Sequence, residues 1–221
     1  EKLSKISNFE SVLPMNTGAE AVETAIKAAR RWGYFTKGIK KNCAEIIVAE
    51  GNFHGRTTTI VGFSSEKEYK KGFGPFADGF IEAKYCSSSC NCSKVCENSI
   101  RSIKNAINNN TCAVIVEPIQ GEGGIITPQS GWLKQLRELC NENNVLLILD
   151  EIQSGLGRTG KLFAFEHEDI KPDGLILGKA LGGGLLPVSA FLSSKEVMNH
   201  FNPGSHGSTF GGNPLAAKVA S

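Results

Sequence analysis

Short apolar runs rich in β-branched residues alternate along this chain with stretches of helical periodicity. The runs are apolar throughout instead of alternating with polar residues, which is typical of strands buried on both faces of a sheet. Strand, helix and strand in succession predict an α/β fold with a mostly parallel central sheet and flanking helices. We expect strands at 45–49, 113–116, 145–149, 175–177 and 188–192, and helices at 19–32, 95–108 and 132–143.

The composition is that of an ordinary globular domain, and it argues against two classes of partner. The chain has 221 residues, of which 40% are hydrophobic and 21% charged, with a formal net charge of +2. The positive residues are scattered, so nothing indicates a nucleic-acid-binding surface. No apolar run approaches the roughly 20 residues that cross a bilayer, so we expect no membrane partner.

The length suits one domain, and we expect residues 1–221 to form it. The chain begins at Glu1 and not at Met, and it stops where a new helix begins at Asn213-Pro214-Leu215. We therefore expect a fragment of a longer protein, truncated at both ends. The compartment stays open between cytoplasm and mitochondrial matrix, because a targeting segment would precede Glu1.

Seven cysteines fall into two groups. Three isolated ones lie in or beside apolar runs, where small buried thiols are expected: Cys43, Cys112 and Cys140. Four others lie close together: Cys86, Cys90, Cys92 and Cys96. A disulfide or a zinc knot is an open alternative there, but the spacing is not the usual paired C-x-x-C and no histidine is near. We expect a cysteine-rich surface insertion at 86–96 and no metal site.

Polar, glycine-rich or charged residues follow four of the predicted strands. In open α/β sheets, ligands bind in the crevice beyond the carboxyl ends of the strands. Core packing does not account for such groups at four separate strand ends. The four segments are 51–56, 117–122, 150–153 and 178–179.

Asp150 and Lys179 are separated by the length of one strand–crossover–strand unit, so we expect them to face one crevice. A lysine at the end of an apolar strand is predicted to be partly desolvated, which lowers an amine's pKa and makes it a nucleophile toward carbonyls. An aspartate beside it can hold the protonated nitrogen of a pyridine ring, and the two together are the signature of pyridoxal phosphate. On spacing alone, a buried Lys–Asp ion pair or two solvated loop residues explain the pattern as well.

Two segments suit the phosphate of such a cofactor. Thr17 can cap the helix predicted at 19–32, Gly18 lets the backbone approach closely, and a helix N-terminus binds anions. Ser208-Thr209, flanked by glycines, is a second candidate phosphate contact. Phe53, in a polar loop, can stack on the ring, although a lone phenylalanine more often belongs to a core.

A rival motif occupies 155–161, which matches the nucleotide-binding pattern G-x-x-x-x-G-K. Leu162 follows where Ser or Thr would ligate magnesium. The segment also lies several residues beyond its strand, with Asp150 and Glu151 intervening near any phosphate. The sequence therefore disfavours a nucleoside triphosphate site.

Taken together, these segments resemble the class III aminotransferases, which are fold type I enzymes dependent on pyridoxal phosphate. The motifs that carry the resemblance occur in the family's order over nearly the whole chain, at 16–21, 53–57, 117–122, 149–153, 155–160, 177–184 and 208–214. Within the family, further stretches are most similar to the ornithine branch, at 31–34, 37–39, 72–76 and 203–209. His54 departs from that branch, which usually has Trp there.

The resemblance implies the large, cofactor-binding domain of fold type I, without the small C-terminal domain. It implies a homodimer with the active site at the subunit interface, and small amino acid and 2-oxo acid substrates. The implied reaction transfers the δ-amino group of ornithine to 2-oxoglutarate, giving glutamate semialdehyde and glutamate. The alternatives are an acetylornithine-type or 4-aminobutyrate-type transferase, a semialdehyde aminomutase, or a non-catalytic metal-binding module at 86–96.

The resemblance also implies roles for the ring contacts and for catalysis. Lys179 would bind the cofactor covalently and move a proton between substrate and cofactor. Asp150 would pair with the pyridine nitrogen, Gln153 would contact the phenolic oxygen, and Phe53 would stack on the ring beside His54.

Other implied roles concern the phosphate and the substrate. Gly18 and Ala19 amides would hold the phosphate, with Thr17 and Ser208 beside it, and Thr209 would reach the phosphate of the partner subunit's cofactor. The implied substrate contacts are three. Arg56 would bind a carboxylate, Glu122 would mask a C-terminal arginine while ornithine is bound, and Glu117 would support the site.

Overall fold

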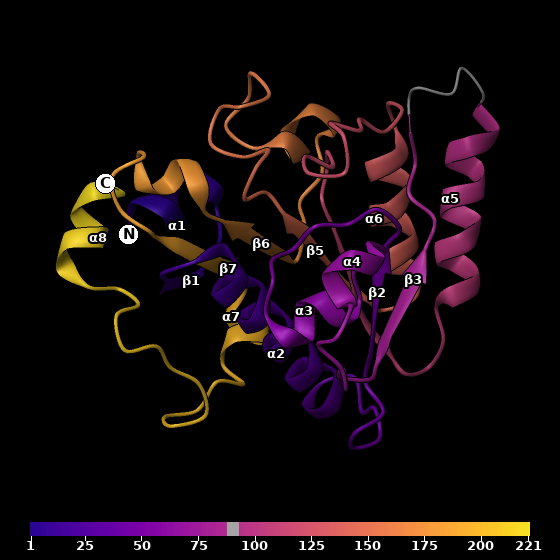
Figure 1. The fold of residues 1–221 in the computed structure, drawn as a ribbon, viewed down its shortest axis with the longest axis horizontal. Helices are drawn as coiled ribbons and strands as arrows, with labels where there is room; N and C mark the ends of the chain where they lie inside the picture. The colour runs from indigo at the N-terminus through magenta and orange to yellow at the C-terminus, as the bar shows by residue number, and fades with distance from the viewer. Residues whose placement is uncertain (88–92) are drawn as a thin grey trace.

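The computed structural model describes residues 1–87 and 93–221, and within 93–96 only the backbone (Figure 1). Within these residues one seven-stranded sheet runs through the molecule in the order β1-β7-β6-β5-β4-β2-β3. The strands are β1 (Ser11–Met15), β2 (Glu45–Ala49), β3 (Phe80–Ala83), β4 (Thr111–Val116), β5 (Leu146–Asp150), β6 (Gly174–Leu177) and β7 (Ser189–Ser193).

The sheet is mostly parallel, as the sequence predicts. Strands β3, β2, β4, β5 and β6 run parallel to one another. Strand β7 runs antiparallel to both β6 and β1.

The sequence did not predict β1 and β3, the two edge strands. Their side chains are mostly half-buried, and Pro14 interrupts the apolar pattern of β1. Edge strands bury only part of their surface, so their sequences lack the continuous apolar run.

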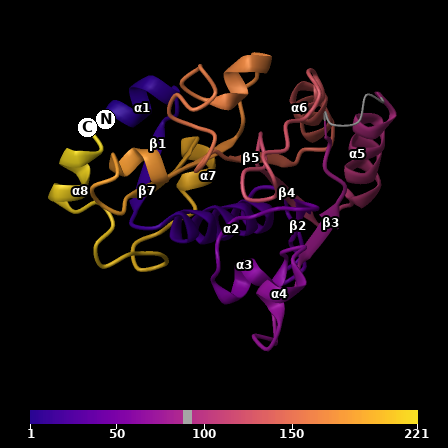
Figure 2. The same cartoon turned by 45° about the horizontal axis from the view of Figure 1, so that its top comes forward.

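Helices cover both faces of the sheet, as Figure 2 shows. Helix α2 (Gly18–Phe35) packs on one face, where it contacts β4, β6 and β7. Helices α5 (Ser93–Ala106) and α6 (Trp132–Glu142) pack on the other. Neighbouring residues of a strand serve opposite faces: Ile46 belongs to the core under α2, and Ile47 to the core under α6. All three helices were predicted, and burial on both faces explains the uninterrupted apolar strands.

Shorter helices make the connections. They are α1 (Lys2–Ser7), α3 (Thr58–Gly62), α4 (Lys67–Lys70), the 3-10 turns η1 (Ala164–Glu168) and η2 (Lys179–Gly182), α7 (Lys195–Met198) and α8 (Pro214–Val219). Helix α8 begins where the sequence predicted, with the side chain of Asn213 accepting from Ala216 N at 2.9 Å. No helix in the described part of the chain is long and apolar enough to cross a membrane.

The predicted cysteine-rich insertion falls largely outside the described residues, which omit 88–92 and the side chains of 93–96. Its first residue, Cys86, is described and is fully buried, whereas a surface position was expected. Cys112 and Cys140 are buried thiols as predicted, and Cys43 is half-buried. Burial raises the pKa of both buried thiols to about 12, so they are inert at neutral pH. In the described residues no group of three His, Cys, Asp or Glu side chains could hold a metal ion.

Candidate active site

A cavity of about 210 Å³ lies beyond the carboxyl ends of the parallel strands, where α2 begins. Loops that follow β2, β4, β5 and β6 all reach it, because parallel strands end at the same edge of the sheet. Of the residues that line it, the sequence had singled out all but Gly55 and Ile152. The lining consists of Gly18, Ala19, Phe53, His54, Gly55, Glu117, Asp150, Ile152, Gln153 and Lys179.

Asp150 is the last residue of β5 and is 4% exposed. Its Oδ1 accepts a hydrogen bond from Ile152 N at 3.0 Å. Its Oδ2 lies 2.7 Å from Nδ1 of His54, and a protonated imidazole donates from both ring nitrogens. The carboxylate is thereby held in one orientation at the cavity wall, with lone pairs left for a further donor.

His54 lies beneath Asp150, and its side chain is fully buried. Burial alone would lower the pKa of His54, but the hydrogen bond and charge of Asp150, with the charge of Glu117, raise it above its usual value. The protonated imidazole then neutralises a buried carboxylate. Its Nε2 is buried and has no hydrogen-bond partner within the described residues.

Glu117 follows β4 and is 5% exposed. Its carboxylate accepts from Phe53 N at 3.0 Å and from Gly121 N at 3.3 Å. Burial raises the pKa of Glu117, an effect that the charge of His54 opposes. Glu117 therefore holds the backbone at Phe53 in place, and the supporting role implied for it stays a prediction.

Lys179 follows β6 after Gly178 and opens the turn η2 with a left-handed φ of 41°. Its Nζ donates to Oε1 of Gln153, the residue predicted to lie beside the cofactor's phenolic oxygen. The sequence predicted a partly desolvated amine, and that prediction is wrong for this chain, because Lys179 is exposed. Strand β6 ends at Leu177, as predicted, but Lys179 belongs to the turn η2, so its side chain projects from a turn at the mouth of the cavity and not from the buried sheet.

The N-terminus of α2 forms one end of the cavity. Thr17 caps the helix as predicted: its hydroxyl accepts from Glu20 N at 3.3 Å, while the Glu20 carboxylate accepts from Thr17 N at 2.8 Å. The N–H groups of Gly18 and Ala19 have no acceptor within the described residues, and both residues line the cavity. A helix start with free N–H groups favours an anion. Thr17 itself serves as the cap and does not line the cavity.

Two lining residues were missed by the sequence argument. Ile152 lies between Asp150 and Gln153, and a Cβ on Gly18 would come within 2.8 Å of its Cδ1. Gly55 has a φ of 130°, and its added Cβ would lie 2.9 Å from Ala19 Cβ. Both residues set how closely the strand-end loops approach α2. Their position inside motifs already singled out was the available signal, but an isoleucine and a glycine carry no chemistry of their own.

Two predicted substrate contacts lie near the cavity but do not line it. Arg56 is exposed, and its Cζ lies 4.2 Å from the ring centroid of Tyr69 and 5.6 Å from that of Phe53. Glu122 is exposed and lines a neighbouring cavity of about 290 Å³, which also includes Phe53 and Tyr69. The two cavities therefore share the Phe53 side chain as a common wall.

Ser208 and Thr209 do not reach the cavity of their own chain. They line a separate hollow of about 440 Å³ together with Asn16, Glu20 and His206. The Ser208 hydroxyl accepts from Asn16 Nδ2 at 2.9 Å, and Thr209 is exposed. Ser208 was predicted to contact the cofactor's phosphate, and it does not line the cavity of its own chain.

The rival segment 155–161 consists of turns, and no α-helix follows it directly, since the next element is the 3-10 turn η1. Lys161 donates its Nζ to Glu166 O at 2.7 Å. A nucleotide-binding loop of this pattern needs a helix start behind its glycines. The structure thus agrees with the sequence in disfavouring a nucleoside triphosphate site here.

Comparison with known proteins identifies the family to which this chain is similar. The family model described as aminotransferase class III matches residues 1–221. Ornithine aminotransferase of Brevibacillus brevis is 57% identical over 220 residues, covering 100% of this chain and 52% of the relative. Ornithine aminotransferase 2 of Staphylococcus aureus is 59% identical with the same coverage. The chain spans about half the length of the curated relatives it matches.

Solved structures with a similar fold are also aminotransferases. The ornithine aminotransferase of Toxoplasma gondii superposes with a TM-score of 0.92 at 44% identity, over 99% of this chain and 49% of that one. An acetylornithine aminotransferase of Elizabethkingia anophelis gives 0.79 at 46% identity, over 99% and 48%. Because the family match runs over the whole chain, this protein belongs to the class III aminotransferases.

Proposed function

We propose that this chain is the cofactor-binding part of an enzyme that transfers the δ-amino group of ornithine to 2-oxoglutarate, giving glutamate semialdehyde and glutamate. The relatives at 57–59% identity are named ornithine aminotransferases, which supports ornithine as the donor. The observation that carries the chemistry is that Asp150 and Lys179, at the ends of the adjacent strands β5 and β6, line one cavity.

The residues of that cavity fit pyridoxal phosphate, and the Toxoplasma gondii structure holds this cofactor at partial occupancy in its active site. When bound, the cofactor supplies an aldehyde that takes up the amino group and a ring that accepts electrons from the bond being broken. Asp150 has free lone pairs for a pyridinium N–H, and its contacts with His54 and with Ile152 N hold the carboxyl group in place. Gly18 and Ala19 offer two unoccupied N–H groups to the phosphate.

Lys179 acts at the open side of the cavity. Its Nζ would hold the cofactor covalently between turnovers, and the free amine would take up and return a proton. Gln153, which accepts from Nζ here, is placed to orient the amine. Its amide group can serve as donor to the ring oxygen once Nζ has moved.

Arg56 and Glu122 stand on the substrate side. Arg56 presents guanidinium donors to a carboxylate, and Glu122 offers a carboxylate at the neighbouring cavity.

We infer that the enzyme is a homodimer with Thr209 acting on the partner's cofactor. Thr209 is exposed and lies outside the cavity of its own chain. Phe210, which follows it in the chain, is 68% exposed, and Leu215, which lines one hollow with Phe210, is 64% exposed. Such exposed apolar groups favour burial against a second copy.

One alternative keeps support from a specific observation. The acetylornithine aminotransferase of Elizabethkingia anophelis is 46% identical, slightly above the 44% of the Toxoplasma gondii enzyme. A panel of ornithine, N-acetylornithine and 4-aminobutyrate with 2-oxoglutarate separates the donors. We expect the highest kcat/KM with ornithine, and a preference for either other donor would contradict the proposal.

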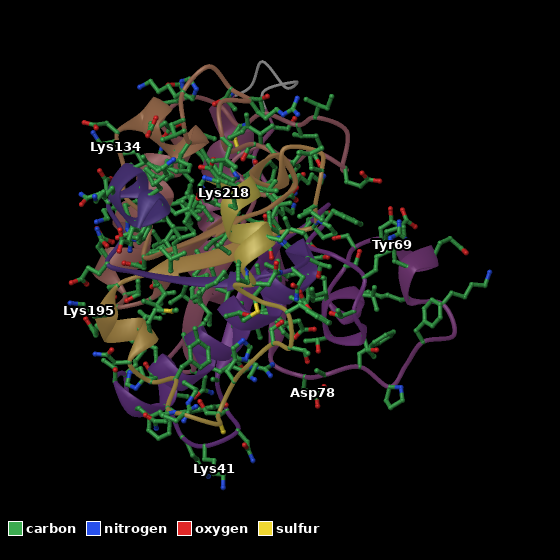
Figure 3. The ribbon with its side chains drawn as sticks, turned by 90° about the vertical axis from the view of Figure 1, so that its left-hand side faces the viewer. Lys41, Tyr69, Asp78, Lys134, Lys195 and Lys218 are labelled. Atoms are coloured by element: carbon green, nitrogen blue, oxygen red, sulfur yellow. The ribbon has the colours of Figure 1, made fainter. Side chains whose placement is uncertain are left out.

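An absorption spectrum of the full-length protein with pyridoxal phosphate tests the chemistry. We expect a visible band that shifts on adding ornithine and is absent in Lys179→Ala. Lys134→Ala, at an exposed lysine of α6 (Figure 3), is the matched control and should keep the band. A band that persists in Lys179→Ala would contradict the assignment.

A further inference from the structure

Tyr69 belongs to none of the motifs identified in the sequence, yet its ring contacts Arg56, which is predicted to bind a substrate carboxylate. It sits on the four-residue helix α4, which stands out from the body of the domain in Figure 3. The Arg56 Cζ lies 4.2 Å from the Tyr69 ring centroid, inside the range of a cation–π contact. Half-buried Tyr69 therefore has one ring face occupied by the guanidinium.

Phe53 closes the other side of this contact. The Phe53 and Tyr69 rings meet edge to face, with centroids 6.0 Å apart and planes at 76°. Arg56 Cζ lies 5.6 Å from the Phe53 centroid. The guanidinium thus rests in a corner formed by two rings, one of which also lines the candidate cofactor cavity.

The guanidinium makes no hydrogen bond and no ion pair to any described residue. Stacking uses the flat face of the guanidinium and leaves its in-plane N–H donors free. Those donors can form a bidentate pair of hydrogen bonds with a carboxylate. A long exposed side chain otherwise samples many rotamers, which costs binding free energy when one is selected. A ring that restricts these rotamers prepares the donors for a ligand.

Two hydrogen bonds hold the loop after β2, which carries Phe53 and Arg56, close to the segment that leads to α4 and Tyr69. Gly51 N donates to Ser65 Oγ at 2.8 Å, which ties the strand end leading to Phe53 to the segment leading to α4. Asn52 Nδ2 donates to Phe63 O at 3.3 Å across the same gap. Tyr69 also lines the 290 Å³ cavity that contains Glu122. Tyr69 therefore contacts Arg56 and lines the same cavity as Glu122.

We propose that Tyr69 is a positioning and specificity-determining residue, whose ring holds the Arg56 guanidinium against Phe53 so that its N–H donors meet the carboxylate of the amino donor. The inference rests on the proposed function, since Arg56 is assigned to a substrate carboxylate there. The Tyr69 hydroxyl makes no hydrogen bond within the described residues, so the ring face and not the hydroxyl carries the effect.

The test compares Tyr69→Leu with Tyr69→Phe in the full-length enzyme loaded with cofactor. Tyr69→Leu should raise the KM for ornithine about tenfold and change kcat less than about twofold, because a cation–π contact of this kind contributes on that scale. Tyr69→Phe keeps the ring and should behave as the wild type. For 1,4-diaminobutane, which is ornithine without its carboxylate, kcat/KM should be the same in all three proteins.

A double variant separates positioning from folding. In an Arg56→Lys background, Tyr69→Leu should add little further loss, since Tyr69 acts through the guanidinium. Thermal unfolding and cofactor absorbance, recorded on each variant, report the fold and the loaded site. Equal losses for ornithine and 1,4-diaminobutane, additive losses with Arg56→Lys, or Tyr69→Phe as impaired as Tyr69→Leu would each overturn the proposal.

The failure of the proposed function is a separate outcome. A wild-type enzyme that does not use ornithine would contradict the substrate assignment. The Tyr69 comparison is then made with the α-amino acid that the donor panel identifies and with its decarboxylated analogue. An unchanged KM in Tyr69→Leu for that donor would overturn the positioning role alone.

Discussion

His54 Nδ1 lies 2.7 Å from Asp150 Oδ2, and the two side chains are buried together beneath the candidate cofactor cavity. Each group of this buried pair needs the other, because either one alone would be a buried charge without a partner. The pair therefore links the stability of the domain to the chemistry above it. Replacing His54 tests both.

His54→Phe should destabilise the fold by about 3 kcal/mol, since it leaves Asp150 buried without its donor. The raised pKa of His54 fixes the sign of the pH dependence. In the wild type, this contribution is fully present below the unfolded pKa of about 6.5 and is lost as pH rises through the higher folded pKa. Urea unfolding from pH 6 to 9 checks this. A variant that keeps the wild-type slope above pH 6.5 would contradict it.

Glu151 provides an independent pH effect below neutrality. Burial raises its pKa to about 7, although its carboxylate accepts from Ala164 N at 2.7 Å and Phe165 N at 3.0 Å. The protonated form is favoured in the folded state, so stability should fall as pH rises from about 4.5 to 7, by on the order of 3 kcal/mol. Glu151→Gln should remove that slope in unfolding experiments. An unchanged slope in the variant would assign it to another group.

Gly18→Ala should weaken cofactor binding at least tenfold. The new Cβ would lie 2.8 Å from Ile152 Cδ1, so the Ile152 side chain, which lines the cavity, must shift. Ile152→Val removes that Cδ1, and the next nearest Ile152 atom lies at 3.5 Å. The double variant should therefore recover most of the affinity, measured by cofactor titration. A Gly18→Ala protein with wild-type affinity would show that this approach is not needed.

The proposed dimer predicts different outcomes for two equally exposed phenylalanines. Phe210 is 68% exposed beside Thr209, and Phe35 is 66% exposed at the end of α2. In the full-length protein, Phe210→Asp should shift the sedimentation equilibrium toward monomer and weaken cofactor binding, because Thr209 would no longer reach its partner. Phe35→Asp should do neither. Dissociation by Phe35→Asp, or none by Phe210→Asp, places the interface elsewhere.

The sequence predicted the parts of the site that carry chemistry at the ends of buried strands. Asp150, Lys179 and Glu117 each follow an apolar run, and the parallel sheet brings such positions together whatever the details of packing. Thr17 was found for a similar local reason, since a cap and its capping box are separated by three residues only. Both kinds of signal are short in range or fixed by topology.

What the sequence did not predict depends on tertiary contacts. The exposure of Lys179 follows from the turn η2, which Lys179 opens with a left-handed φ of 41°. Tyr69 meets Arg56 only because the loop after β2 is tied to the segment before α4. Strand β7 is antiparallel to its neighbours, but its residues are all buried, and the apolar sequence of such a strand does not indicate its direction. In each case, the deciding contact joins segments whose sequences carry no common pattern.

The central claim is that Lys179, and no other lysine, holds the cofactor at the mouth of this cavity. Borohydride reduction of the full-length protein loaded with pyridoxal phosphate fixes the cofactor to its lysine, and mass spectrometry of a protease digest then locates it. We predict a single modified site, on the peptide that contains Lys179, and its loss when ornithine is added before the reductant. A cofactor found on another lysine, or on none, would contradict the account.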